Sequence, residues 1–116
     1  MRFLCVYKPG VAESHTPPTA EEQAVMGRLI GDMAKAGVLL GVEGCLPSNY
    51  GARVTLEGGK YSITDGPFPE TKELIAGLCL LQVKSKDEAL EWTKRFLSAV
   101  GHGTSEVLQL HETPAG

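Results

Sequence analysis

Hydrophobic and polar positions along the chain predict six strands and two helices. The segments at 2–8 and 38–46 are apolar on both alternating faces, which is typical of strands covered on both sides. The almost unbroken apolar run at 74–83 predicts a central strand of the same kind. A last short strand is expected at 106–111, followed by a frayed tail at 113–116.

The remaining two strands form a predicted hairpin. Residues 53–57 and 60–64 alternate apolar and polar side chains on either side of Gly58-Gly59, a dipeptide typical of two-residue hairpin turns. One face of this hairpin is apolar and the other polar. We therefore expect it at an edge of the sheet, with one face in water.

Both predicted helices begin with a capping box. Thr19 is followed three residues later by Glu22, and Ser85 is followed by Glu88. Apolar residues at helical spacing continue from each cap, so the helices are expected to end near Gly37 and near residue 100. Each helix has one apolar face to pack on a sheet.

The order of the predicted elements indicates an α+β fold. Without the hairpin it reads β-α-β-β-α-β, the ferredoxin-like split βαβ arrangement. Two helices cover only one face of the sheet, yet three strands are apolar on both faces, and 116 residues leave nothing for a third layer. The sequence therefore predicts a homodimer in which a second copy covers the free face, sheet against sheet.

Length, composition and charge fit a single domain over residues 1–116. A net charge of −3 argues against direct nucleic-acid binding, and no apolar run approaches the roughly 20 residues of a membrane span. The first residues lack the pattern of a signal peptide. Cys5, Cys45 and Cys79 lie in apolar segments without Cys-x-x-Cys spacing, so we expect buried, reduced thiols in a cytoplasmic protein.

The most informative stretch runs from Thr64 to Gly77, between two predicted strands. Asp65-Gly66-Pro67 favours a tight turn, since Asp bonds the backbone ahead of it, Gly adopts positive φ and Pro fixes φ. A dense group of ionisable residues follows. A turn that leads directly into a core strand holds its side chains on a stiff frame.

This stretch resembles the signature of the DGPF-domain branch of the YCII-related family. The resemblance rests on the run 64–68, on Glu70, on Thr71-Lys72-Glu73 and on Gly77, and it extends to segments 37–40, 43–47, 87–92 and 106–107. It implies a dimeric α/β barrel of ferredoxin-like subunits. It implies little about a reaction, but the position of some such proteins beside alternative sigma factors in genomes hints at regulation.

Part of the wider family has a histidine on the first helix, proposed to work with an aspartate as an acid–base pair. The corresponding position in this chain is near Met26, and its neighbours are Ala24 and Val25. The helix contains no histidine, which puts such a pair in doubt. His15, in the loop at 9–18, is a substitute only if that loop folds inward onto Asp65.

The sequence predicts a small-molecule pocket beside the turn. Phe68 offers an apolar surface and the charged groups orient a ligand, while the loop at 9–18 closes over them. The candidate catalytic residues are Asp65 and His15. The candidate ligand-binding residues are Asp65, Phe68, Glu70, Lys72 and Tyr7.

Each candidate also has a simpler interpretation. Asp65 is a turn-former, His15 an exposed loop residue, and Glu70, Lys72 and Glu73 a solvated ion-pair cluster. Asp65 with Glu70 and Glu73 could surround a hard cation, but one short loop rarely completes that shell. With no metal-spaced histidines, phosphate loop or dinucleotide fingerprint, no metal or cofactor is expected.

Two classes of function remain open. The first is a dimeric small-ligand-binding or accessory/regulatory protein that has no direct contact with nucleic acid or membrane. The second is a cofactor-free enzyme of the isomerase, lyase or dehydrohalogenase type, doing acid–base chemistry on a small organic molecule. Fold analogy supports either class weakly. The missing helix histidine favours the first.

Overall fold

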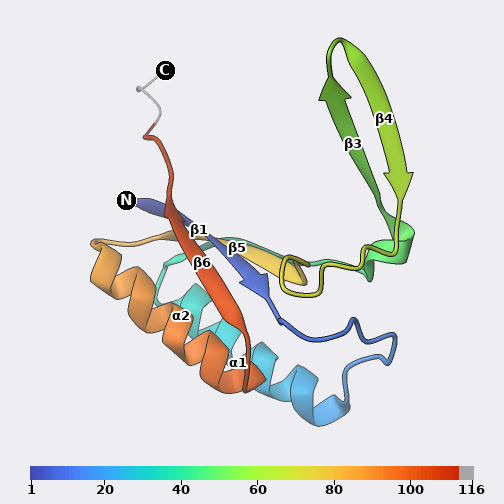
Figure 1. Cartoon of the computed structure of the whole chain (residues 1–116). Coiled ribbons are helices and arrows are strands. Elements are labelled where there is room, and N and C mark those ends of the chain that lie inside the picture. The colour runs from blue at the N-terminus through green and yellow to red at the C-terminus, as the bar shows by residue number, and fades with distance from the viewer. Residues whose placement is uncertain (113–116) are drawn as a thin grey trace.

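The computed structural model describes residues 1–112 and contains the elements that the hydrophobic pattern predicts (Figure 1). The predicted tail at 113–116 lies outside the described residues. The elements are β1 (Arg2–Lys8), α1 (Ala20–Lys35), β2 (Leu39–Gly44), the short 3₁₀ turn η1 (Ser48–Tyr50), β3 (Ala52–Glu57), β4 (Lys60–Asp65), β5 (Gly77–Gln82), α2 (Lys86–Val100) and β6 (Thr104–Gln109).

Four strands form one antiparallel sheet in the order β2-β5-β1-β6. Cys5 at its centre pairs with Cys79 of β5 on one side and with Val107 of β6 on the other. With the hairpin set aside, the chain has the predicted order β-α-β-β-α-β. Within the described part of a single chain the sheet is open, so closing a barrel would require a second copy.

Both helices lie on the same face of this sheet (Figure 1). Their caps are those the sequence predicts: Thr19 Oγ accepts a hydrogen bond from the Glu22 amide, and Ser85 Oγ accepts one from the Glu88 amide, each at 3.1 Å. The buried core lies between helices and sheet. It consists of Phe3, Cys5, Leu29, Met33, Val38, Leu81, Val83 and Ala89. Within residues 1–112, neither helix has the length and hydropathy that a membrane span requires.

The opposite face of the sheet is uncovered. Leu78 and Leu108 point away from the helices, because they alternate with residues that face the core, and they are 36% and 48% exposed. Leu40, at an irregularity in the pairing of β2, is 53% exposed. The prediction of a one-sided helix layer over strands apolar on both faces is therefore confirmed. An apolar sheet face of this kind is unusual for a surface that stays in water.

The hairpin has the predicted strands and pairing but not the predicted position. Val54 pairs with Ile63 and Leu56 with Tyr61, so these four side chains share one face of the ribbon, yet they are 58–74% exposed. Instead of adding to an edge of the sheet, β3 and β4 form a separate two-stranded sheet that projects from the body (Figure 1). The reason is that η1 and the turn after β4 turn the chain away from the main sheet at the base of the hairpin.

Three strands differ clearly in extent from the prediction. β2 (Leu39–Gly44) ends two residues before the predicted 46. β5 begins at Gly77 rather than at residue 74, because the preceding segment turns across the end of β1, where the Ala76 amide donates to the Tyr7 carbonyl at 2.9 Å. β6 occupies Thr104–Gln109, slightly earlier than expected. The residues at which a strand begins and ends depend on its pairing with neighbouring strands. The apolar and polar pattern of the sequence carries no information about that pairing.

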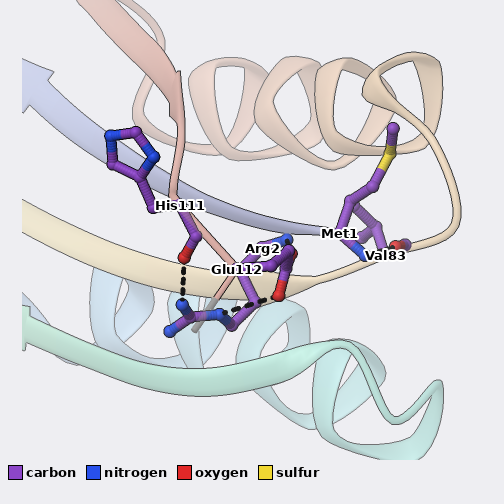
Figure 2. Close-up of polar contacts among 5 residues, drawn as sticks. All are labelled: Met1, Arg2, Val83, His111 and Glu112. Atoms are coloured by element: carbon purple, nitrogen blue, oxygen red, sulfur yellow. Dashed lines mark hydrogen bonds and ion pairs between the residues drawn. The ribbon is translucent and has the colours of Figure 1, made fainter. Parts of the chain in front are cut away.

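The start of β1 is tied to two distant segments (Figure 2). The Met1 ammonium donates to the Val83 carbonyl at 3.0 Å, and Arg2 Nη2 donates to the His111 carbonyl at 2.6 Å. Arg2 Nε also lies 3.6 Å from Glu112 Oε2. These contacts hold the segment after β6 along the first residues of the chain.

Candidate functional site

The turn Asp65-Gly66-Pro67-Phe68, called the DGPF turn below, is fixed by Ser48 in η1. Ser48 Oγ accepts a hydrogen bond from the Phe68 amide at 2.9 Å. The neighbouring Gly66 amide donates to the Gly51 carbonyl at 3.1 Å. Two segments that lie on either side of the hairpin are thereby joined at its base, which makes the turn a stiff structural element.

Glu13 brings the loop at 9–18 to the same point. Its Oε1 accepts from the Ser48 amide at 2.6 Å, and its Oε2 accepts from Ser48 Oγ at 2.7 Å. The loop is thus held beside the turn by a charge-assisted pair of hydrogen bonds. Neither Glu13 nor Ser48 was a candidate from the sequence, because no local pattern links residues 35 positions apart.

Arg53, and not Lys72, is the cation that organises the turn. Its guanidinium lies 4.3 Å from the centroid of the Phe68 ring and contacts both Glu70 oxygens, at 3.3 and 3.5 Å. A hydrogen bond from the backbone amide of Glu70, followed by the Arg53 contact, lowers the pKa of the Glu70 carboxyl. Lys72 is exposed. Phe68 and Glu70 are therefore occupied by a contact within the chain.

Asp65 and His15 are both exposed, Asp65 as the last residue of β4 and His15 in the loop at 9–18. Within residues 1–112, neither a hydrogen bond nor an ion pair joins them. Glu73 contacts Lys8, which also pairs with Glu106, and these two carboxylates raise the pKa of Lys8. The described residues contain no group of three or more His, Cys, Asp or Glu side chains arranged to hold a metal.

A cavity of about 440 Å³, the inner cavity, lies between the two helices and the sheet. Its walls are almost entirely apolar. Thr93 is one of the few polar groups, and its hydroxyl already donates to the Ala89 carbonyl at 2.8 Å. The lining residues are Cys5, Tyr7, Met26, Leu29, Ile30, Met33, Leu39, Val42, Glu43, Gly44, Ala76, Gly77, Leu78, Cys79, Leu81, Trp92, Thr93, Phe96, Val100 and Ser105.

Two cysteines belong to this cavity, and the third does not. Cys5 is buried, with its Sγ 3.7 Å from Thr93 Oγ, and Cys79 lies opposite it on β5. The neighbouring Cys5 and burial raise the pKa of the Cys79 thiol, so Cys79 brings no charge into the cavity at neutral pH. Cys45 is exposed, contrary to the prediction, because β2 ends at Gly44 and Cys45 begins the following loop.

A larger open hollow of about 1150 Å³, the outer groove, adjoins the inner cavity. It is bounded by the loop at 9–18, the first half of α1 and the segments 45–47 and 74–76. Glu13, Glu21, Glu22 and His102 are among its lining residues. The two hollows share the side chains of Tyr7, Met26, Ile30, Ala76 and Val100.

Tyr7 forms the boundary between the two hollows. Its hydroxyl donates to the His102 carbonyl at 2.8 Å, and its ring meets Phe96 edge-on with the centroids 5.0 Å apart. Burial raises the pKa of Tyr7. Among the candidate residues from the sequence, Tyr7 lines both hollows, whereas Asp65, Phe68, Glu70, Lys72 and His15 line neither.

Comparison with known proteins agrees with the resemblance seen in the sequence. The YCII-related domain family matches residues 1–112. "Uncharacterized protein R00369" of Rhizobium meliloti (strain 1021) is 34% identical over 82 residues, which span 68% of this chain and 66% of that protein. That name assigns no activity. A family match over nearly the whole chain nevertheless settles its relationship: the chain belongs to the YCII-related family.

Proposed function

We propose that this chain is a small-ligand-binding protein of the DGPF branch, working as a homodimer in an accessory or regulatory role. The observation that carries the proposal is the inner cavity. Its volume of about 440 Å³ lies within the usual range of small-molecule sites, roughly 300–1,000 Å³, and such sites are mostly apolar. The outer groove, which includes three glutamates, adjoins it.

The same walls favour binding over acid–base catalysis. Met26, close to the position where part of the wider family has a histidine, lines both hollows and brings a thioether there instead. Proton transfer needs a titratable group within hydrogen-bond reach of the reacting atom. Thr93 and Tyr7, both in the cavity wall, already donate their hydroxyl protons to backbone carbonyls. Apart from the Cys5 thiol, whose pKa is lowered to about 7 by its hydrogen bond with Cys79, a ligand in the cavity would meet apolar packing surfaces.

The homodimer is proposed from the uncovered sheet face. A second copy placed there would bury Leu40, Leu78 and Leu108 and would complete the dimeric α/β barrel of ferredoxin-like subunits. The projecting hairpin supports the same assembly, because an isolated two-stranded hairpin is only marginally stable in water without a surface to pack on. The uncovered sheet face and the apolar face of the hairpin belong to the same chain. A symmetric dimer would therefore contain two copies of each surface.

Titration with N-phenyl-1-naphthylamine, an uncharged apolar fluorophore, tests the proposed site. We expect a saturable rise in its emission with the parent protein. The variant Val42→Trp places a large side chain in the cavity wall and should weaken binding by about tenfold or more, because the apolar probe loses its space.

The matched control is Thr55→Trp, which introduces the same side chain on the polar, exposed face of the hairpin, away from both hollows. It should bind the probe like the parent. Circular dichroism and thermal melting of all three proteins would show that they are folded. Absence of saturable binding to the folded parent, or equal binding by the two variants, would refute the inner cavity as the site.

A further inference from the structure

We propose that the ligand is a lipophilic amine, with its apolar body in the inner cavity and its positively charged end in the outer groove. This inference rests on the proposed function and adds the chemical class of the ligand. It combines two observations: the Thr93 and Tyr7 hydroxyls of the inner walls already donate within the chain, and the groove is lined by three glutamates and one histidine, with no lysine or arginine.

The inner cavity selects an apolar body. Trp92 and Phe96 present aromatic surfaces, and Met26 and Met33 add flexible thioethers that adapt to the shape of a ligand. Because Thr93 and Tyr7 donate to carbonyls of the chain, a polar group placed deep in the cavity would lose its water without gaining a new partner. A hydrocarbon chain or an aromatic ring has no hydrogen bonds to water to lose, so its transfer into the cavity carries no such cost.

The outer groove selects the charge of the other end. Glu13, Glu21 and Glu22 line it. No lysine or arginine is among the lining residues of either hollow. The positive end of the α1 dipole, about half a charge, opposes several full negative charges. The net negative charge of the groove attracts a cation and repels a carboxylate.

One molecule can reach both regions because they are contiguous. Tyr7, Met26 and Ile30 contact both hollows, so the apolar wall continues from the inner cavity into the groove. Glu13 is held by Ser48 through two hydrogen bonds, which fixes its negative charge at the groove without neutralising it. A short flexible linker between an aromatic ring and an ammonium group would follow this wall.

Three molecules that share one body and differ only in the end group test the inference. They are 4-phenylbutylamine, 4-phenyl-1-butanol and 4-phenylbutanoate, which at pH 7 are a cation, a neutral molecule and an anion. Their binding is measured by calorimetry and by displacement of N-phenyl-1-naphthylamine. We expect the amine to bind tightest and the carboxylate about tenfold or more weaker than the amine, with the alcohol between them.

Removing one negative charge from the groove should reduce the difference in affinity between the amine and the carboxylate. Glu21→Gln should weaken amine binding several-fold and strengthen carboxylate binding, while leaving the alcohol unchanged. Glu21 makes no capping contact, in contrast to Glu22, so the helix should tolerate the change. Glu91→Gln on α2, outside both hollows, is the control and should preserve the parent order.

Equal or tighter binding of the carboxylate to the parent would overturn the inference while leaving the proposed function intact, since the body would still bind. Loss of alcohol binding in Glu21→Gln to the same extent as amine binding would also overturn it, because charge would not be the cause. Failure of the fluorophore and of all three molecules to bind would overturn both proposals.

Discussion

The Cα atom of Gly66 lies against the carbonyl oxygen of Ser48, so closely that a Cβ on residue 66 would stand 1.8 Å from that oxygen. Only glycine fits there without displacement of backbone. Glycine at this position of the DGPF turn is therefore needed for close approach, since its φ is not among the positive ones.

Gly66→Ala should accordingly destabilise the protein by about 1–3 kcal/mol or more, because the backbone of η1 or of the turn has to move. Denaturant unfolding followed by circular dichroism gives the free energy of unfolding. Gly27→Ala is the matched control, since a Cβ there meets nothing within 4 Å and alanine favours a helix interior. Equal stability of Gly66→Ala and the parent would disprove the contact.

Ser48→Ala should cost about 1–3 kcal/mol of unfolding free energy, since the Phe68 amide loses its acceptor and Glu13 loses one of two donors. The Glu13→Gln variant and the double variant complete a cycle. We expect a coupling energy of about 0.5–3 kcal/mol between the two positions. Ser62→Ala on the hairpin should be close to neutral, and additive effects at 13 and 48 would show that they act independently.

The Arg53–Glu70 contact should give a stability term that depends on pH. The folded-state pKa of Glu70 is lowered, so the contribution is present above its unfolded value, near 4.5, and is lost as the pH falls through the folded value. The difference in denaturant midpoint between the parent and Glu70→Gln should therefore be larger at pH 7 than at pH 3.

Arg53→Gln provides the comparison, because it also removes the contact with the Phe68 ring, which does not titrate. Part of its effect should persist at pH 3. A Glu70→Gln difference that is the same at both pH values would show that the ion pair contributes nothing to folding.

Leu80→Glu should convert the proposed dimer into a monomer. Leu80 lies on the central strand β5, on the sheet face away from the helices, so a carboxylate there would be buried in an apolar interface at a cost of several kcal/mol. Size-exclusion chromatography with light scattering measures the mass. Gln82→Glu adds the same charge further along that face, at an exposed position, and should perturb the dimer less. A monomeric parent protein would rule out the assembly.

Local signals predicted most of the architecture. The capping residues Thr19 and Ser85 start their helices as expected, and Gly58-Gly59 sets the register of the hairpin. These features depend on neighbours within a few positions, which is why periodicity and turn chemistry report them. The helix layer on one face followed from the number of predicted elements. Two helices can cover only one face of the sheet, although three strands are apolar on both faces.

The arrangement of the candidate site depended on contacts that no local pattern records. Arg53 reaches Glu70 across the base of the hairpin, and Glu13 reaches Ser48 across 35 positions. The inner cavity is the space left between the helices and the sheet, a property of how the layers meet. Tyr7, a candidate wall from the sequence on the first strand, lines both hollows. The prediction that the hairpin lies at an edge of the sheet is wrong, because the sequence pattern shows which face of the hairpin is apolar but not what covers that face.

The projecting hairpin also bears on the solubility of the chain. As a ribbon of only two strands it has two open edges, and each presents backbone amides and carbonyls to any other extended segment. Val54, Leu56, Tyr61 and Ile63 add an apolar face beside those edges. Arg53, Glu57, Lys60 and Asp65 are the charges on the same ribbon that oppose edge-to-edge aggregation. Engineering of this chain should therefore preserve these charges, since their loss would favour fibrous association through the open edges of the hairpin.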